Sequence, residues 1–557
     1  MRCRCLRVCL ITVLIGSWLG SDVGAQDDVA TPRPLNMVSS AHPLATEAGV
    51  KVLQDGGNAF DAAVAIAATL NVVEPMNSGM GGYGTILIYD AKSKQVQFLD
   101  SSGKIPMAVD SDVFREPTPG YEDNRTGPKS VSTPGNVNAW QAMSQEYGEL
   151  EWAELFQPAI EVAENGFTVT ERLEQMVAYS YRSFPDHAKA IYSVDGKRIR
   201  EGDLLVQADL AGSLRLVADQ GARVFYDGEL AEQIHEEMQV RGSFLSIEDL
   251  RADRAEWWEP AEIDYHGVQV YTASPPATAF PSLIRLGMMS CVDRSIEGRD
   301  FGHNGVDYLH YFAEITKHAF WCRLKYAGDP EIQPPPLDLL FSKEYWQTEV
   351  DKIDADQATV FEPPGLAAPT SDNTTHFVVA DRHGNIVSAT QTLGNLFGSR
   401  IMPPGTGIWF NNSLAYCTFE PAGNPMDAKP GQRKLSGDCP TIIFRDSKPW
   451  AALGTPGGHT IGQTVPQMVM NLVDFDMTIE DAIAAPRVSF MDPNRLLVEN
   501  TIADSVVEEL KRRGHEIQMV GGLGNAQGLR LIRDADGNGW YYAGAADPRG
   551  EGTAKGF

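Results

Sequence analysis

The residues best suited to chemistry lie in a segment rich in threonine. Thr374-Thr375-His376 opens an apolar run that ends at Asp381, and a second run of similar character ends at Thr392. A threonine hydroxyl is a poor nucleophile by itself and needs a base to accept its proton. The sequence contains no GxSxG, HExxH or Walker A motif. The threonine-rich segment is therefore the most informative place to look for a catalytic site.

Two further patterns could bind a metal ion. His310, Glu314 and His318 fall at helical spacing, but no further ligand is spaced to complete a coordination shell, so a polar helix face is expected. Asp534 begins a stretch like a calcium loop, but its twelfth position is Ala545 rather than Glu, which favours a hairpin turn. The sequence thus predicts no metal site and no cofactor.

The first half of the chain is expected to contain mainly helices, with one early strand. His42–Leu70 has the periodicity of two short helices, and Asn58 is a plausible cap for the second. Glycines at 79–84 precede a predicted strand, Thr85–Tyr89. Dinucleotide binding needs a strand before the glycines and a helix after them, so this order excludes it. The region from Pro134 to Trp346 is predicted to be mainly helical.

Strand signals dominate after a polar, proline-rich stretch at 362–373. Thr374–Ala380 and Ile386–Thr392 are predicted as two strands joined by a turn at 382–385. Helices are expected at His459–Val473 and Ile479–Ala484. The further predicted strands are Ile408–Phe410, Thr441–Phe444 and Trp450–Leu453.

Composition narrows the function class. The 557 residues carry 74 Asp and Glu against 46 Lys and Arg, which gives a formal charge of −28. Such a field repels polyanions, so nucleic acid and anionic membranes are not expected as partners. Residues 1–25 combine an arginine-rich start, a short apolar run and the small residues Val23-Gly24-Ala25. This pattern predicts a signal peptide and an exported protein, periplasmic or extracellular.

Four cysteines follow this segment, and no later stretch is long and apolar enough for a membrane helix. Cys291, Cys322, Cys417 and Cys439 show no CxxC spacing. Buried apolar cysteines are expected, with room for one disulfide among several possible connectivities.

The segment from Thr374 to Thr392, followed by Phe397-Gly398, resembles the signature of the γ-glutamyltranspeptidase family of N-terminal-nucleophile hydrolases. Similar landmarks occur in the same order along most of the chain. The other matching segments are Ala41–Ala45, Gly56–Ala63, Val73–Pro75, Ser78–Gly82, Thr133–Gly135, Gly328–Pro330, Asn411–Asn412, Gly454–Gly458 and Ala546–Arg549.

The resemblance implies an α+β fold, a four-layer αββα sandwich, and a precursor that cuts itself between Asn373 and Thr374. The expected organisation is a signal peptide at 1–25, a large fragment at 26–373 and a small catalytic fragment at 374–557. The chemistry is consistent, because a free α-amino group has a pKa near 7.7–8.0 and can act as the base for its own hydroxyl. The two fragments are expected to stay associated as a heterodimer.

The resemblance also assigns roles. It implies that Thr374 is the nucleophile, that Thr392 orients its terminus, and that Gly457 and Gly458 offer backbone N–H groups to the developing oxyanion. Glycine suits the last role because, lacking Cβ, it lets backbone donors approach a substrate closely.

The residues that would hold a γ-glutamyl carboxylate differ from the family pattern. The family uses an arginine, whose position here is taken by Ser102, and a Ser-Ser pair, which here is Ser436-Gly437. Lys104 is the only cation near the expected arginine. The loss of an arginine–carboxylate pair removes a charge-assisted contact.

The positions that would hold the α-amino group differ as well. The family's Asn, Gln or Glu, and Asp correspond here to Gly394, Ser413 and Tyr416, and Asn395 could replace the first after a one-residue shift. The missing aspartate removes the partner of an ammonium group.

The sequence therefore supports an enzyme acting on a small γ-glutamyl or related amide, with two alternatives. One is an amidase or acylase of the same chemistry that acts on a different acyl group. The other is a secreted, non-catalytic binding protein, which the retained Thr374, Thr392 and Gly457-Gly458 disfavour.

Overall fold

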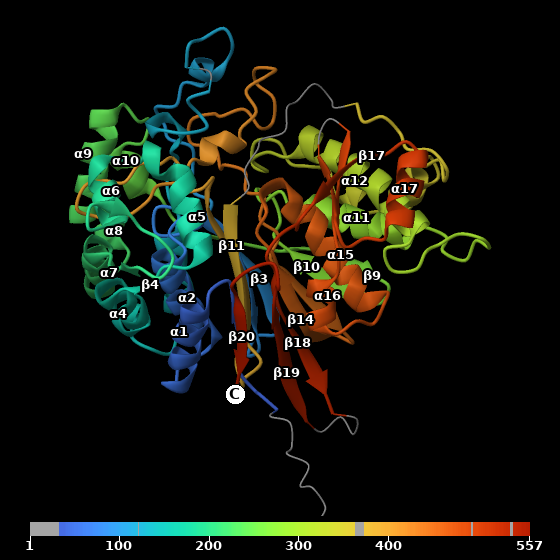
Figure 1. The fold of residues 1–557 in the computed structure, drawn as a ribbon, viewed down its shortest axis with the longest axis horizontal. Helices are drawn as coiled ribbons and strands as arrows, with labels where there is room; N and C mark the ends of the chain where they lie inside the picture. The colour runs from blue at the N-terminus through green and yellow to red at the C-terminus, as the bar shows by residue number, and fades with distance from the viewer. Residues whose placement is uncertain (1–32, 121, 363–372, 492–493, 535–538) are drawn as a thin grey trace, which may run out of the picture.

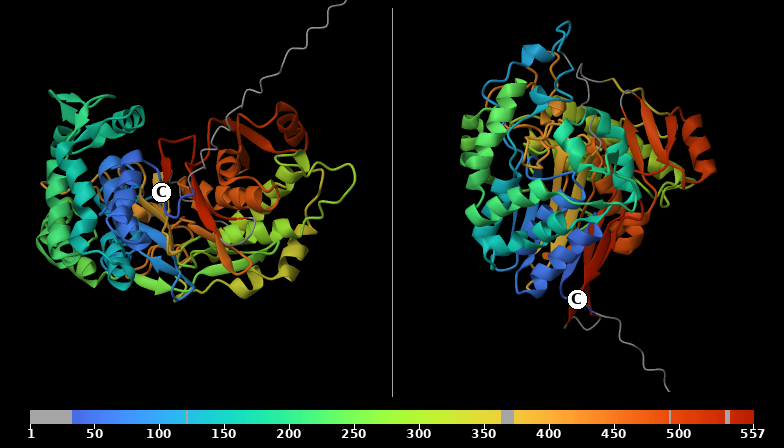
Figure 2. Two further views of the ribbon diagram at one scale, coloured as in Figure 1. Left: turned by 90° about the horizontal axis from the view of Figure 1, so that it is seen from below. Right: turned by 60° about the vertical axis from the view of Figure 1, so that its left-hand side comes forward.

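The computed structural model describes residues 33–120, 122–362, 373–491, 494–534 and 539–557. The predicted signal peptide at 1–25, residues 535–538 of the calcium-loop-like stretch and most of the 362–373 stretch lie outside these ranges. Two antiparallel sheets pack face to face at the centre, and helices cover the outer face of each (Figures 1 and 2). This is the predicted four-layer αββα sandwich.

The larger sheet has seven strands, and every neighbouring pair is antiparallel. In spatial order these are β20 (Thr553–Gly556), β1 (Met37–Ser40), β11 (Asn373–Ala380), β12 (Ile386–Gly394), β2 (Tyr83–Asp90), β3 (Gln95–Asp100) and β8 (Glu256–Trp258).

The second sheet has six strands, also antiparallel throughout. In spatial order these are β19 (Trp540–Ala546), β18 (Gln527–Arg533), β14 (Lys448–Gly454), β13 (Thr441–Arg445), β10 (Val268–Thr272) and β9 (Ala261–Tyr265). Strands β11 and β12 of the first sheet contact β14 of the second, so the sheets pack face to face there.

The first helical layer packs on the seven-stranded sheet through α2, which is buried along its whole length. Asn58 caps α2, because its side chain accepts hydrogen bonds from the N–H groups of Phe60 and Asp61. The carboxylate of Asp61 in turn accepts a hydrogen bond from the Asn58 N–H. Helices on this side are α1 (Pro43–Gln54), α2 (Ala59–Val73), α3 (Asn136–Tyr147), α4 (Gln157–Asn165), α5 (Glu171–Ser180), α6 (Asp186–Ile191), α7 (Ala208–Gln220), α8 (Arg223–Asp227), α9 (Glu229–Arg241) and α10 (Ile247–Ala252).

The second helical layer packs on the six-stranded sheet through α11, α15 and α16. Helices on this side are α11 (Phe280–Ser290), α12 (Val306–Tyr326), α13 (Leu337–Leu340), α14 (Lys343–Val350), α15 (Ile461–Val473), α16 (Ile479–Ala484) and α17 (Asp504–Arg512). A small third sheet on this side has β15 (Val488–Met491), β16 (Arg495–Glu499) and β17 (Glu516–Val520).

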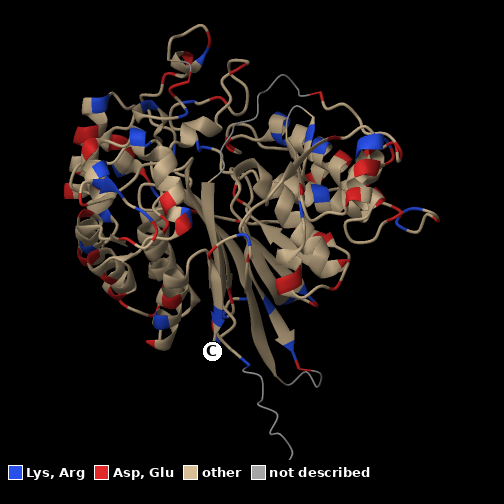
Figure 3. Ribbon diagram, in the orientation of Figure 1, with Lys and Arg blue, Asp and Glu red and all other residues tan. Residues whose placement is uncertain are grey.

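Two cores follow from this layering. On β11, Phe377 and Val379 belong to the core under the first helical layer, whereas Val378 and Ala380 belong to the core between the sheets and under the second layer. Both faces of the strand are therefore buried. Lys, Arg, Asp and Glu lie mainly on the outer helices and loops, and the central strands are nearly free of them (Figure 3).

One of the sequence-based expectations is wrong. Instead of a strand at Ile408–Phe410, the structure has a single bridge between Phe410 and Gly81. The region from Pro134 to Trp346 is mainly helical, as expected, but it also supplies β8, β9 and β10. Strands β9 and β10 form a hairpin around His266-Gly267, and the residues of β9 alternate between buried and exposed.

The four described cysteines are free thiols, so the structure has no disulfide among them. Cys322, Cys417 and Cys439 are buried and Cys291 is partly exposed. None of the helices in the described ranges combines the length and apolar character needed to cross a membrane.

Candidate active site

Thr374 lies near the start of β11, where the side chain is only 2% exposed. The hydroxyl of Thr392, on the neighbouring strand β12, is a hydrogen-bond hub. It accepts from Thr374 Oγ1 at 3.2 Å and from the N–H of Gly394 at 2.8 Å, and it donates to the carbonyl oxygen of Asn373 at 2.6 Å. The structure thus brings the predicted nucleophile, its predicted orienting residue and the predicted scissile peptide together.

The strand pairing changes register at this point. Asn373 pairs with Gly394, whereas Thr375 pairs with Gln391, so the β11–β12 ladder is irregular around Thr374. Such irregularities interrupt ladder bonding and redirect side chains. Beyond the irregularity, Thr375 Oγ1 donates to the carboxylate of Glu74 at the end of α2, on the helix side of the sheet. The peptide between 373 and 374 therefore lies outside the regular ladder.

The two predicted oxyanion glycines form a turn between β14 and α15. Gly457 has φ +136°, and a Cβ there would come within 2.5 Å of the hydroxyl of Thr460. Gly458 opens the short 3₁₀ helix that leads into α15. Gly458 is thus at the position where the N–H group of a helix has no acceptor inside that helix.

Polar residues fill the space between the sheets below Thr374. His376 lies two residues further along β11, and its Nδ1 forms a hydrogen bond of 2.8 Å with Thr390 Oγ1. A Cβ on Gly454, at the end of β14, would clash with the imidazole of His376, so the two sheets approach closely here. Burial lowers the pKa of His376 to about 3, so this imidazole is neutral at physiological pH.

Aromatic rings extend the site from Thr392 towards the glycine turn. Tyr83 on β2 pairs with Thr392, and its ring meets Tyr416 edge to face at 6.5 Å between centroids. A Cβ on Gly437 would lie 3.6 Å from the carbonyl oxygen of Gly458 and 3.8 Å from the ring of Tyr416. Tyr416, Gly437 and Gly458 are therefore neighbours in this wall.

The serines predicted to hold a substrate carboxylate are engaged by aspartates. Ser102 donates to Asp100 at 2.8 Å, and Ser436 donates to Asp438 at 2.7 Å. Burial raises the pKa of both carboxyls to about 6. Lys434 lies within electrostatic range of both aspartates, and the sequence analysis did not single it out.

The predicted alternative cation, Lys104, points elsewhere. Its ammonium is half-exposed and lies 3.5 Å from Glu256. It lines a cavity of about 150 Å³ whose walls also include Asp100, Asp253 and Arg433, and none of Thr374, Thr392, Gly457 or Gly458.

Residues predicted to lie near an α-amino group are held by neighbouring protein groups. Ser413 is buried and forms a hydrogen bond with Ser132. Gly394 has φ +97°, and a Cβ there would clash with Asn412, so any side chain would be crowded at this position. The backbone N–H of Asn395 donates to Asn412 Oδ1 at 2.8 Å, next to Gly394.

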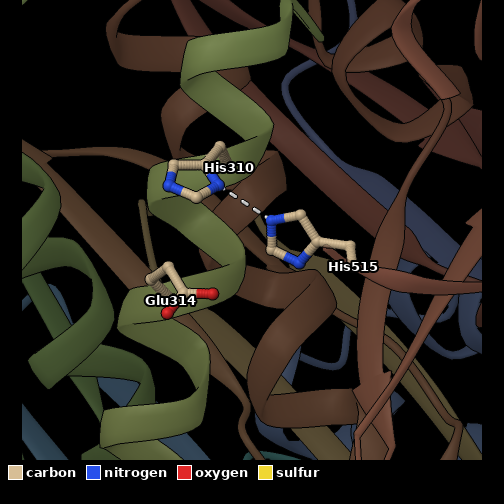
Figure 4. Close-up of side chains that lie close together, drawn as sticks. All are labelled: His310, Glu314 and His515. Carbon is tan, nitrogen blue, oxygen red and sulfur yellow. Dashed lines mark hydrogen bonds between the residues drawn. The ribbon is translucent and has the colours of Figure 1, made fainter. Parts of the chain in front are cut away.

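A cluster of two histidines and a carboxylate lies between α12 and the residue before β17 (Figure 4). Ligand atoms of His310, Glu314 and His515 lie within 4.8 Å of one another. His310 Nε2 faces the carbonyl oxygen of Asp354 at 2.8 Å, so this nitrogen carries the proton. His310 Nδ1 consequently accepts from His515 Nε2 at 2.8 Å.

Two imidazoles and a carboxylate are a donor set that zinc uses, but the carboxylate is already occupied. The ammonium of Lys317 lies 2.6 Å from one oxygen of Glu314, and the N–H of Thr359 donates to the other at 3.1 Å. His318, the third member of the predicted helical pattern, instead contacts Tyr345 at 2.8 Å. We interpret the cluster as a buried hydrogen-bond network, and the absence of a metal remains an expectation.

Comparison with known proteins decides the family. Residues 45–557 match the family described as Gamma-glutamyltranspeptidase. The chain belongs to the γ-glutamyltranspeptidase family. It is 32% identical over 546 residues to a glutathione hydrolase proenzyme from Escherichia coli, a match that covers 94% of this chain and 93% of the relative.

Members of this family with different names are about equally similar. An acylase proenzyme from a Pseudomonas species is 33% identical over 536 residues, covering 93% of this chain and 92% of the relative. The crystal structure of cephalosporin acylase from Bacillus halodurans superposes with a TM-score of 0.84 at 29% identity, covering 98% of this chain and 99% of that one. This chain is accordingly a γ-glutamyltranspeptidase-like amidohydrolase of the N-terminal-nucleophile type.

Proposed function

We propose that Thr374 becomes the N-terminal nucleophile of this enzyme after a cut between Asn373 and Thr374, and that its acyl-enzyme transfers the acyl group to water or an amine. The observation that carries this proposal is the position of the Thr392 hydroxyl. It contacts Thr374 Oγ1 and also donates to the carbonyl oxygen of Asn373.

The same geometry supports a mechanism for the cut. Thr374 Oγ1 attacks the carbonyl carbon of Asn373, and the hydrogen bond from Thr392 stabilises the charge that develops on the carbonyl oxygen. The peptide C–N bond then breaks, and the nitrogen takes up the proton that the hydroxyl loses. Water hydrolyses the resulting ester, which leaves a carboxylate on Asn373 and a free α-amino group on Thr374.

Turnover would repeat this chemistry on an amide substrate. The new α-amino group accepts the proton of Thr374 Oγ1 while the oxygen attacks the substrate carbonyl. The N–H groups of Gly457 and Gly458 would receive the oxyanion, and Thr392 would keep the terminus in place. The substrate C–N bond then breaks, and the α-ammonium group gives its proton to the leaving amine. Water or another amine afterwards takes the acyl group from Thr374.

The two fragments of the cut chain would remain one particle. In the seven-stranded sheet, β11 and β12 of the small fragment lie between β1 and β2 of the large fragment, and β20 pairs with β1 on the other side (Figure 1). In the six-stranded sheet, β13 pairs with β10. Separating the fragments would break both sheets, which supports the heterodimer. The pattern of residues 1–25 supports export to the periplasm or the cell exterior.

Membership of the family does not fix which acyl group the enzyme transfers. Ser102, Gly437 and Tyr416 stand where the family pattern expects an arginine, a serine and an aspartate. These differences favour a related acyl group over γ-glutamyl, in line with the full-length structural similarity to a cephalosporin acylase. The substrate is a small amide in either case.

Electrophoresis and an amidase assay of the purified protein test the proposal. The wild type should separate into fragments of about 38 and about 20 kDa under denaturing conditions, as 348 and 184 residues predict. Thr374→Ala should remain a single, inactive chain, whereas Thr374→Ser should be cut and turn over more slowly. Thr348→Ala, on the exposed face of α14, is the control and should match the wild type. Cutting at the same place in Thr374→Ala would refute the mechanism.

A further inference from the structure

Lys434 is a buried cation inside the candidate site. The residue is 1% exposed, and within the described structure its ammonium has no hydrogen-bond acceptor. Its Nζ lies 2.6 Å from the centroid of the Tyr83 ring. We propose that the ammonium of Lys434 binds a carboxylate on the acyl group of the substrate, so that the enzyme selects amides of acidic acyl groups. This inference rests on the amidohydrolase function proposed above.

The position of Lys434 relative to the nucleophile supports this role. Tyr83, whose ring contacts the ammonium, pairs across the strands with Thr392. Thr392 in turn contacts Thr374 Oγ1 at 3.2 Å. Tyr83 therefore contacts Lys434 with its ring and is the cross-strand neighbour of Thr392, which contacts the nucleophile. This arrangement is suitable for binding the far end of a short acyl chain while its amide carbonyl meets Thr374.

No neighbouring group in the described structure accepts a hydrogen bond from the ammonium of Lys434. Ser102 and Ser436 give their hydroxyl hydrogens to Asp100 and Asp438, so each aspartate already accepts a hydrogen bond. Neither aspartate accepts a hydrogen bond from Lys434 Nζ, which has no partner in the described structure. A lysine ammonium has three N–H donors, and burying them without acceptors is costly. A ligand acceptor would remove that cost.

Charge explains why this acceptor should be a carboxylate. Burial lowers the pKa of Lys434, and the carboxylates of Asp438 and Asp100 oppose this effect. A bound carboxylate would add to that opposition and hold the proton on Lys434. Asp100 and Asp438 accept hydrogen bonds from Ser102 and Ser436, so a substrate carboxylate would be the first direct acceptor for the ammonium. A neutral acyl chain would leave the three N–H groups unpaired.

The test compares acyl groups that differ in one feature. Wild type and Lys434→Met are assayed with glutaryl p-nitroanilide, γ-glutamyl p-nitroanilide and pentanoyl p-nitroanilide. Methionine has nearly the shape of lysine without its charge. We expect kcat/KM of Lys434→Met to fall tenfold to a hundredfold on the carboxylate-bearing substrates, mainly because KM rises. The loss of a hydrogen bond to a charged group typically changes affinity by such a factor. The ratio of kcat/KM for the glutaryl compound to that for the pentanoyl compound should fall by at least the same factor.

The outcomes separate recognition from a structural role. Lys434→Arg should keep most of the preference for the glutaryl compound, and normal appearance of the two fragments would show that Lys434→Met folds. Equal losses on all three substrates, or no loss on the glutaryl compound, would overturn the proposal. The ratio of the two acidic substrates shows whether the recognised carboxylate belongs to a γ-glutamyl group or to an acyl group without an amine.

A binding measurement keeps the inference independent of turnover. Calorimetry of the wild type with glutaric acid monoamide should detect binding that pentanamide and Lys434→Met lack. If none of the three anilides is hydrolysed but this difference is found, the amidohydrolase proposal fails and the role of Lys434 stands. If the monoamide binds both proteins equally, the role of Lys434 fails.

Discussion

The hydroxyl of Thr392 donates a hydrogen bond of 2.6 Å to the carbonyl oxygen of Asn373, the residue that precedes Thr374. The same hydroxyl accepts from Thr374 Oγ1. One side chain on β12 thus contacts both the attacking atom and the group that would be attacked. This arrangement makes Thr392 a positioning residue for both the cut and the later turnover.

Thr392→Ala should slow the appearance of the two fragments by tenfold or more, since removal of one oxyanion donor commonly costs a hundredfold or more in rate. In the protein that is eventually cut, kcat should fall more than KM changes, because the contact is to the catalytic terminus. Time-resolved electrophoresis and steady-state kinetics measure these effects. Thr392→Ser should restore both rates, and a fully active Thr392→Ala would show that the hydroxyl has no such role.

Gly394→Ala should destabilise the protein and delay the cut. The added Cβ would meet Asn412, and a φ of +97° is strained for alanine. We expect a loss of roughly 1–3 kcal/mol in the free energy of unfolding, measured by denaturant titration of the uncut Thr374→Ala background. Gly212→Ala is the matched control, because nothing lies within 4 Å of its Cβ position in α7, and it should stabilise slightly. Equal stability of the two variants would contradict the geometry at Gly394.

His515 should make the protein sensitive to acid. Burial, with help from Lys317 and His310, lowers its pKa to about 3. The unfolded chain takes up a proton near pH 6.5 that the folded chain refuses, so this contribution to stability is present above pH 6.5 and is lost as pH falls towards 3. At ~1.4 kcal/mol per pH unit the full effect is a few kcal/mol.

His515→Gln should flatten the fall in unfolding free energy between pH 6.5 and 3. The exposed His383→Gln serves as the control and should leave the slope of the wild type unchanged. Chemical denaturation at several pH values provides the measurement. Parallel curves for the wild type and His515→Gln would mean that folding does not lower the pKa of His515.

Glutathione and γ-glutamyl amides should be poor substrates relative to glutaryl amides. Tyr416 stands where an aspartate would bind the α-amino group, and Ser413 is already bonded to Ser132. The wild type should therefore show a kcat/KM for the glutaryl anilide equal to or above that for the γ-glutamyl anilide. A hundredfold preference for the γ-glutamyl compound would contradict this prediction. Asp438, which lies next to Lys434, would then be the first residue to replace with asparagine.

Much of the architecture could be predicted from local patterns. The cap at Asn58 and the boundaries of β11 and β12 follow from residue types and periodicity that act within a few positions of each other. The hairpin of β9 and β10 was overlooked although Ala261–Tyr265 alternates in polarity and His266-Gly267 is a suitable two-residue turn. A period-2 search in the helical region would have found it.

The side-chain contacts of the candidate active site could be predicted only in part. The family resemblance pointed to Thr374 and Thr392, and the structure places them in contact. Nothing in the local sequence shows that Ser436 would donate to Asp438 or that Lys434 would be buried against Tyr83, because these contacts join segments hundreds of residues apart or depend on side-chain direction. The one available signal was a charged residue two positions before a predicted substrate-binding serine.

The interleaving of strands in both sheets has a consequence for folding. Before a cut, β1 and β11 belong to one polypeptide, and their pairing is a loop closure whose entropy grows only slowly with length. After a cut, the same pairing would require two separate chains to meet, so recovery from denaturation would become concentration-dependent. The uncut Thr374→Ala protein could regain its structure at high dilution, whereas the processed enzyme, once denatured, could not. Maturation would then make unfolding irreversible in practice. The enzyme is assembled once, as a single chain, and its lifetime is set by the rate at which it unfolds.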